Sequence, residues 1–351
     1  MSQLLIYGAN GYTGELIARE AVRRGISPIL AGRSEEVTSL ANELGVPSRI
    51  FPLDAPERIV DALSGLRVVL NCAGPFSQTA CPLAEACLRT STSYLDITGE
   101  IGVFESLAAH DSQARDAEIT LLPGVGFDVV PTDCLAAHLK RRLPTATQLR
   151  LAFQALSRIS RGTARTMIEN LHRGGMVRKG GNLQAVPAAW KPRQIDFGDG
   201  PLDAITIPWG DVSTVYYSTG IGDIEVYTAV PWALRAAALA SRFLIPLMEA
   251  APFQTLFHKF IASRPAGPTA EERAAGRSHI WGEVSDESGT RAVSRLHGPE
   301  AYSLTVQTAL TAAERVLAGS APTGFQTPST AFGVDFILDI PGVDREDVTA
   351  N

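Results

Sequence analysis

Three glycines near the start of the sequence have a spacing suited to binding a phosphate group. Gly8, Gly11 and Gly14 follow a short apolar run, Leu4 to Tyr7, and precede a helical pattern of apolar residues. Glycine lets the backbone turn tightly and approach a pyrophosphate, which the free N–H groups at the start of a helix attract. This order predicts a dinucleotide-binding fold, the alternative being a glycine-rich turn without a ligand. The expected ligand contacts are Gly8, Asn10, Gly11, Tyr12, Thr13 and Gly14.

The residue that follows the second predicted strand, 27–31, indicates which dinucleotide is bound. NAD-binding proteins usually have Asp or Glu there, about 20 residues beyond the glycines, to hold the ribose 2′-hydroxyl group. This chain has Arg33 with Ser34 beside it, and a guanidinium group can pair with a 2′-phosphate. We therefore expect NADP, with Asp54 near the adenine. The alternative is that Arg33 is an ordinary surface arginine.

The carboxyl ends of later predicted strands, 67–71 and 93–97, carry residues suited to hydride and proton transfer. In open α/β sheets the cofactor and its substrate meet at this edge. The residues expected to bind the cofactor there are Ala73, Gly74, Pro75, Phe76 and Thr98. A proton donor must lie within hydrogen-bond reach of the substrate, and the candidates are Tyr94, Asp96 and Asp128, with Glu100 beside them. We expect Asp96 and Thr98 to face the cofactor; alternatively, Asp96 and Asp128 brace loops or cap helices.

Composition limits the class of protein. The chain has 351 residues, 45% of them hydrophobic and 19% charged, which is enough for two domains with apolar cores. Its net charge of −6 argues against a nucleic-acid binder, because phosphate backbones attract basic surfaces. The four cysteines lack C-x-x-C spacing and the six histidines are scattered, so we expect reduced thiols and no metal site. Because the first predicted strand leaves no room for a signal peptide, we expect a cytoplasmic protein.

The order of the predicted elements divides the chain into two domains. Residues 1–130 alternate strands and helices, which predicts a Rossmann domain with a parallel sheet that binds NADP. For residues 131–324 we predict an α+β domain with a mostly antiparallel sheet, used for substrate binding and dimerisation. Its expected strands lie at 149–153, 212–218, 224–230, 278–284 and 291–296. Its other expected elements are a helix at 163–173, a glycine-rich loop at 174–181 and a helix at 302–317. We expect residues 325–351 to return to the first domain.

Two segments allow more than one interpretation. Residues 232–262 are apolar, but charged residues and two prolines interrupt them, so we expect no transmembrane helix. They predict helices that cover the second sheet or a subunit interface, or alternatively a hydrophobic lid or membrane-contacting surface that receives a lipid-like substrate. Residues 160–163, with arginines nearby, would suit an anionic group of the substrate, or form a solvated loop.

Several motifs occur together in the first 135 residues. They are GANGYTG at 8–14, AGR at 31–33, NCAGPF at 71–76, YLDITGE at 94–100 and PGVGFDVVPTD at 123–133. In combination they resemble the saccharopine dehydrogenase-like oxidoreductases, which include trans-acting enoyl reductases. The resemblance implies NADP binding, a Rossmann domain and a second domain with an antiparallel sheet. Beyond these residues the resemblance is weaker. The family usually has two glycines before the position of Thr163, whereas this chain has Arg161 and Gly162.

We therefore expect an NADP-dependent oxidoreductase that transfers a hydride to or from an unsaturated or carbonyl-bearing small molecule. If residues 232–262 form a hydrophobic lid or membrane-contacting surface, this substrate is hydrophobic and lipid-like. One alternative is a reductase or dehydrogenase of amino-acid-derived secondary amines, which an anion-binding pair of arginines would favour. Another is a non-catalytic NADP-binding sensor. We expect a homodimer without a nucleic-acid partner or a transmembrane segment, and peripheral membrane contact is left open.

Overall fold

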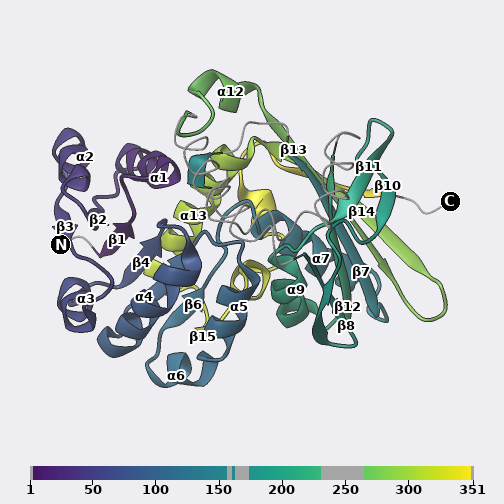
Figure 1. Cartoon of the computed structure of the whole chain (residues 1–351), viewed down its shortest axis with the longest axis horizontal. Coiled ribbons are helices and arrows are strands. Elements are labelled where there is room, and N and C mark those ends of the chain that lie inside the picture. Colours follow the sequence, from purple (N-terminus) through teal and green to yellow (C-terminus); the bar gives the residue numbers. More distant parts are fainter. Residues whose placement is uncertain (1–2, 156–159, 163–173, 231–264, 349–351) are drawn as a thin grey trace, which may run out of the picture. The chain divides into compact units, whose positions relative to one another are not determined.

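The computed structural model describes residues 3–155, 160–162, 174–230 and 265–348. The chain divides into two compact units, and most of their elements are labelled in Figure 1. The first unit comprises Met1–Val130 and Tyr302–Phe336, and the second comprises Pro131–Ala301 and Ile337–Asn351. This division differs from the predicted one in two places, because residues 302–324 lie in the first unit and residues 337–351 in the second.

The first unit is built on a parallel sheet of seven strands. In the order of the chain they are β1 (Leu4–Tyr7), β2 (Ile29–Gly32), β3 (Ser48–Ile50), β4 (Val68–Asn71), β5 (Ser93–Asp96), β6 (Thr120–Leu122) and β15 (Gly324–Phe325). Their order across the sheet is β15-β6-β5-β4-β1-β2-β3. The order reverses between β1 and β4, which is where a dinucleotide crosses the edge of such a sheet. The predicted Rossmann sheet is thus confirmed, and β15 is an additional strand that the sequence interpretation did not predict.

Helices connect these strands and cover the sheet (Figure 1). They are α1 (Tyr12–Arg23), α2 (Glu36–Leu44), α3 (Pro56–Leu63), α4 (Phe76–Thr90), α5 (Ile101–Ala108), α6 (Asp111–Asp116), α13 (Ala301–Leu317) and α14 (Pro328–Phe332). The 3-10 helix η1 (Phe336–Asp339) starts at the last residue of this unit, and its other residues belong to the second unit. Ala109 and His110 separate α5 from α6.

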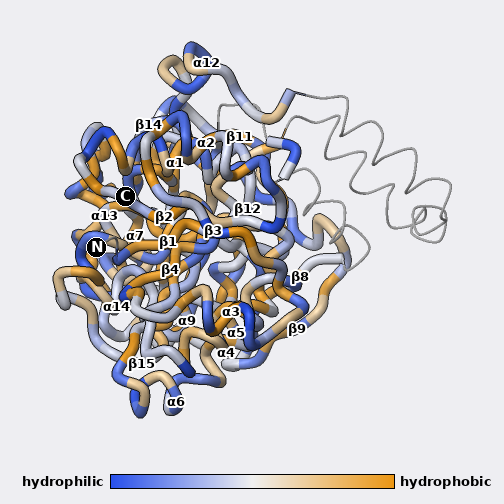
Figure 2. The backbone as a smooth tube through the Cα atoms, turned by 90° about the vertical axis from the view of Figure 1, so that its left-hand side faces the viewer, coloured by the Kyte–Doolittle hydropathy of each residue, from blue (hydrophilic) through white to orange (hydrophobic). Residues whose placement is uncertain are grey.

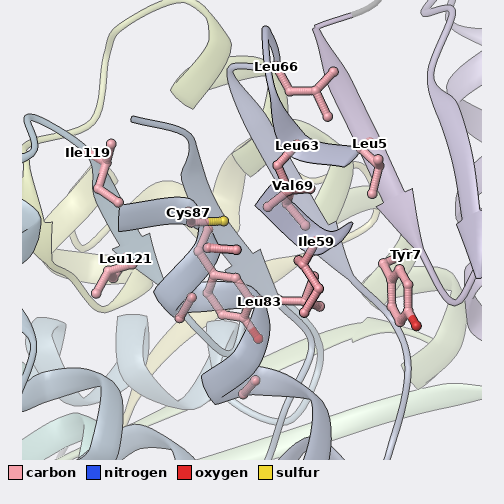
Figure 3. Close-up of a cluster of buried hydrophobic side chains, with 14 of the residues drawn as sticks. Leu5, Tyr7, Ile59, Leu63, Leu66, Val69, Leu83, Cys87, Ile119 and Leu121 are labelled. Atoms are coloured by element: carbon pink, nitrogen blue, oxygen red, sulfur yellow. The ribbon is translucent and has the colours of Figure 1, made fainter. Parts of the chain in front are cut away.

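An apolar core fills the space between this sheet and helices α3 to α6. Strand residues Leu5 and Val69 meet helix residues Leu63 and Leu83, and all four side chains are buried (Figure 3). Strands β1 and β4 are accordingly among the most hydrophobic stretches of the tube in Figure 2. Burial of each such side chain stabilises the fold by roughly 1.5–3 kcal/mol relative to exposure. This core holds the carboxyl ends of the strands in place.

The second unit contains a mixed, mostly antiparallel sheet. Its strands are β7 (Gln148–Ala155), β8 (Gly175–Lys179), β9 (Asn182–Val186), β10 (Pro192–Asp196), β11 (Pro201–Thr206), β12 (Asp223–Ala229), β13 (Arg277–Ser285), β14 (Arg291–Pro299) and β16 (Asp344–Val348). The main path runs β10-β11-β12-β7-β13-β14-β16, and among its pairs only β12 and β7 are parallel. The described helices are α7 (Val130–Arg142), α9 (Asp211–Thr219) and α12 (Ala270–Ala275). This sheet confirms the predicted fold class of the second domain.

Two local predictions for this unit are wrong. Residues 212–218 form helix α9 instead of a strand, and the four consecutive residues 212–215 are all buried, which a strand exposed on one face would not show. The expected glycine-rich loop is the β8–β9 hairpin, turned at Gly180 and Gly181, which both have positive φ. The predictions for residues 163–173 and 232–262 lie outside the described residues. No helix among the described residues is long and apolar enough to cross a membrane.

Candidate functional site

The turn after β1 is packed too tightly for side chains at two of its glycines. Gly8 has a φ of +78°, and a Cβ atom there would lie 2.8 Å from the backbone nitrogen of Ala73. A Cβ atom on Gly14 would lie 2.2 Å from the carbonyl oxygen of Gly8. Gly11 is less constrained, because its Cβ atom would approach the same oxygen only to 3.3 Å. The backbone itself therefore requires glycine at positions 8 and 14.

Helix α1 begins after an N-cap residue, Gly11, that has no side chain with which to cap the helix. The N–H group of Gly11 donates to the carbonyl oxygen of Gly8 at 3.0 Å. The amino end of a helix carries partial positive charge and N–H groups without helical partners, so it attracts anions. Asn10 lies beside this end, where its amide donates to Glu36 Oε2 at 2.9 Å. The structure thus brings the six predicted contacts of the glycine turn together at one helix start.

Arg33 follows the carboxyl end of β2 with an exposed side chain. Among the residues that the structure describes, its side chain makes no hydrogen bond or ion pair. The positive charge of Arg33 also acts on Tyr7 at the end of β1. Burial raises the pKa of Tyr7 to about 12, and the charge of Arg33 partly opposes this increase. Ser34 is half-buried, and Asp54, after β3, is exposed. A free guanidinium group at this position is suited to pairing with a phosphate.

The segment after β4 carries four predicted cofactor contacts, Ala73 to Phe76, and leads into helix α4. The carboxylate of Glu100 caps this helix by accepting hydrogen bonds from the N–H groups of Phe76 at 2.8 Å and Ser77 at 3.0 Å. The amino end of α4 is therefore occupied by a carboxylate, in contrast to the end of α1. Glu100 was considered as a proton donor from the sequence, whereas the structure places its carboxylate on backbone N–H groups.

Tyr94 and Asp96 on β5 are fully buried and bonded to each other. The Tyr94 hydroxyl donates to Asp96 Oδ2 at 2.8 Å, and Asp96 Oδ1 accepts from the N–H groups of Thr98 at 3.0 Å and Gly124 at 2.9 Å. Burial raises the pKa of Asp96 to about 6, although these donors act in the opposite direction. Thr98 is also fully buried. The hydrogen bonds that Asp96 makes to the backbone of these loops are those of the loop-bracing alternative.

Asp128 lies on the loop between β6 and α7 and is only half-buried. Its Oδ2 atom is so close to the 98–100 segment that a Cβ atom on Gly99 would lie 2.8 Å away. Desolvation raises the pKa of Asp128 to about 7. Helix α13 fixes the backbone of this loop, because Thr305 Oγ1 accepts from the N–H of Phe127 at 2.9 Å. Asp128 is thus a positioned carboxyl group that can gain or lose a proton near neutral pH.

One functional feature was not recognised in the sequence. Asn71 ends β4, and its buried amide donates to the Tyr94 hydroxyl at 3.1 Å. The available signal was a polar residue at the end of the apolar strand Val-Val-Leu-Asn. Within the described residues, no group of three or more His, Cys, Asp or Glu side chains is arranged to hold a metal ion.

The fold and these contacts define a dinucleotide-binding domain of the Rossmann class. Residues 4–122 match the family model of the saccharopine dehydrogenase NADP binding domain, so the predicted resemblance and the NADP-binding character are confirmed for this part of the chain. The trans-acting enoyl reductase of Mycobacterium leprae is 36% identical over 149 residues, which cover 40% of this chain and 36% of that protein. A saccharopine dehydrogenase-like oxidoreductase of Mus musculus is 27% identical over 161 residues, covering 40% of this chain and 38% of that protein.

Similarity in three dimensions extends over the whole chain. Apo saccharopine dehydrogenase (L-Glu forming) from Saccharomyces cerevisiae superimposes with a TM-score of 0.62 at 12% identity, covering 99% of this chain and all of that one. At this identity the likeness shows the fold of both units. The sequence matches span only a little over a third of the length of the curated relatives.

Proposed function

We propose that this protein is an NADP-dependent oxidoreductase that transfers a hydride to or from an unsaturated or carbonyl-bearing small molecule. The observation that carries the proposal is a helix α1 that starts at Gly11, which has no side chain to cap it, together with the exposed Arg33 at the end of β2, whose side chain makes no hydrogen bond or ion pair within the described residues. The first feature suits a pyrophosphate and the second a ribose 2′-phosphate. The matching family model, which describes an NADP binding domain, supports the same assignment.

The residues proposed to bind NADP follow the carboxyl ends of β1, β2, β3 and β4, at one edge of the sheet. The backbone of the glycine turn would hold the pyrophosphate, because Gly8, Gly11 and Gly14 have no Cβ atom that would keep the ligand at a distance. Arg33 and Ser34 would hold the 2′-phosphate, and Asp54 would lie at the adenine. Ala73 to Phe76 would line the nicotinamide half, and Phe76 offers a ring face to it. When bound, the cofactor supplies or accepts the hydride.

Asp128 is the group that we assign to proton transfer. It is half-buried, and its raised pKa of about 7 leaves both protonation states populated near neutral pH. Asp96 and Tyr94 were candidates from the sequence, but their fully buried oxygens are already engaged in hydrogen bonds with one another and with backbone groups. Asp128 therefore holds the proton, while β5 supports the loops around it.

The second unit would supply the substrate site. The relatives named trans-acting enoyl reductase favour an unsaturated, hydrophobic substrate over an amino-acid-derived amine. Strands β10 and β16 lie at the two ends of the main path of the second sheet within the described residues, and an edge strand can pair with a second copy, so we propose a homodimer. We further propose that the protein acts in the cytoplasm.

The proposal is tested by calorimetric titration of the wild-type protein with NADPH and with NADH. We expect NADPH to bind at least about tenfold more tightly, because a charge-assisted hydrogen bond contributes roughly 1.5–3 kcal/mol. Arg33→Ala should remove this preference while leaving NADH binding unchanged. Arg67→Ala is the matched control, since Arg67 is exposed at the opposite, amino end of the same sheet.

The two failures of this experiment have different meanings. If neither nucleotide binds at millimolar concentration, the proposed oxidoreductase function is wrong. If both nucleotides bind equally tightly and Arg33→Ala changes neither affinity, the proposed preference for NADP is wrong, but the proposed oxidoreductase function is not. Tight NADPH binding without turnover of any enoyl, carbonyl or imine compound would instead support the sensor alternative.

A further inference from the structure

A buried polar network crosses the carboxyl ends of β4 and β5 and continues to the loop after β6. Its side chains are Thr79, Asn71, Tyr94 and Asp96, which we call the edge network. The Asn71 amide nitrogen donates to Thr79 Oγ1 at 3.0 Å and to the Tyr94 hydroxyl at 3.1 Å. The Tyr94 hydroxyl in turn donates to Asp96 at 2.8 Å. The four side chains therefore form one connected chain of hydrogen bonds.

The edge network fixes the backbone of the loop that follows β4. Asn71 Oδ1 accepts from the N–H group of Ala73 at 3.0 Å, and Thr79 Oγ1 donates to the carbonyl oxygen of Ala73 at 2.7 Å. The backbone N–H group and the carbonyl oxygen of Ala73 are thus both hydrogen-bonded to side chains. Ala73 is also the residue that a Cβ atom on Gly8 would strike. The network consequently sets the spacing between the glycine turn and the neighbouring loop.

At its other end the network holds the two loops that surround Asp128. The Asp96 carboxylate binds the N–H groups of Thr98 and Gly124, and the Asp96 carbonyl oxygen accepts from Val125 at 2.8 Å. Asn71 and Asp96 have no exposed surface. Such groups cannot touch a cofactor or a substrate, but the loops that they hold can.

We infer that the edge network is a positioning device for the nicotinamide half of the site, which shapes three loops without contacting the ligand. This inference rests on the proposed function. It assigns Asn71 and Thr79 a role that neither the motifs nor the matching family model gives them. It also changes the role of Tyr94 and Asp96 from candidate catalytic residues to positioning residues. Buried networks whose members are all satisfied hold such loops rigidly.

The test compares two probes in calorimetric titrations of the full chain. NADPH occupies both halves of the site, whereas adenosine 2′,5′-bisphosphate occupies only the adenine half. The variants are Tyr94→Phe, which disconnects Asn71 from Asp96, and Asp96→Asn, which removes the acceptor charge. Thr92→Val is the matched control, because the Thr92 hydroxyl is equally buried but lies at the amino end of β5, where it donates to the carbonyl oxygen of Leu66 at 3.2 Å.

We expect Tyr94→Phe and Asp96→Asn to weaken NADPH binding about fivefold or more, since each leaves a buried polar group unsatisfied. Binding of the bisphosphate should change less than about twofold in both, which also shows that the variants are folded. The fluorescence emission of bound NADPH should shift toward that of the free nucleotide in these two variants. Thr92→Val should leave both affinities and the emission as in the wild type.

Three results would overturn the inference. Unchanged NADPH affinity and emission in both network variants would show that the network does not position the nicotinamide. An equal loss of affinity for both probes, or a loss of folding in both variants, would show that it supports the unit as a whole. A wild-type protein that binds neither probe would remove the proposed function itself and this inference with it, whereas the first two results leave the proposed function standing.

Discussion

Gly14 lies directly against the carbonyl oxygen of Gly8, which is only 2.2 Å from the position of a Cβ atom on Gly14. Gly14→Ala must therefore push α1 away from the turn after β1. We expect the free energy of unfolding to fall by about 1–3 kcal/mol, as in other overpacked sites, and NADPH binding to weaken with it. Denaturant unfolding followed by circular dichroism measures the first effect.

Gly102→Ala is the control for this change, because Gly102 also lies in the first turn of a helix, α5, but has nothing within 4 Å of its Cβ position. Alanine there should leave stability unchanged or raise it by up to about 1 kcal/mol. Equal stability of Gly14→Ala and wild type would contradict the packing described here.

Glu100→Gln removes the charge that caps α4. The carboxylate binds the N–H groups of Phe76 and Ser77, so its loss should lower the free energy of unfolding by about 1 kcal/mol. The effect should shrink in high salt, because screening weakens charge–dipole interactions. Glu85→Gln, at an exposed position of the same helix, should change stability by less than about 0.5 kcal/mol. Equal effects of the two substitutions would rule out the capping role.

Asp128 should titrate near pH 7 in the native protein. Its pKa is raised from 3.8 to about 7, so between these values the native state keeps a proton that the unfolded state has lost. The free energy of unfolding of wild type relative to Asp128→Asn should therefore decrease as pH rises from about 4 to about 7. Carbon-13 NMR of aspartate-labelled protein measures the pKa directly. The signal of Asp128 is the carboxyl signal that is missing from the spectrum of Asp128→Asn. If that signal titrates near pH 4 in the wild type, the raised pKa is wrong.

Thr305→Val should loosen the loop that carries Asp128. The Thr305 hydroxyl accepts from the buried N–H of Phe127, and loss of that acceptor should cost about 1–3 kcal/mol of stability. Hydrogen exchange of the Phe127 amide should become faster in the variant. Thr311→Val in the same helix is the comparison, because Arg24 retains its ion pairs with Glu20 and Glu314 when Thr311 Oγ1 is removed. Unaltered exchange at Phe127 would show that another contact holds this loop.

Local pattern was sufficient for most of the first unit. Apolar strands alternate there with helices. Gly8 and Gly14 could be recognised in the sequence, because the close approach of backbone atoms requires glycine at both positions. In the second unit the valines and tyrosines of 212–218 suggested a strand, but the segment is buried along consecutive residues and forms α9. The β-propensity of these residues was outweighed there by the burial of consecutive side chains, which a helix packed on several sides allows. The Gly180-Gly181 pair was a hairpin signal that could have been read.

The roles of polar groups were harder to predict than their location. Tyr94, Asp96 and Asp128 were all candidates for proton transfer, yet a sequence does not show which oxygen is exposed. Asp96 is saturated by hydrogen bonds from Tyr94, Thr98 and Gly124, and two of these donors are backbone groups whose position only the fold determines. Asp128 differs by its partial exposure.

The first unit is assembled from two distant stretches of the chain, Met1–Val130 and Tyr302–Phe336. During synthesis at about 5–20 residues per second, roughly 10–30 s separate the emergence of these two stretches from the ribosome. A nascent chain can form the glycine turn early, but Thr305 and strand β15 emerge only after the whole of residues 131–301. The nucleotide site is therefore completed in two stages, and the edge beside Asp128 takes its final form late.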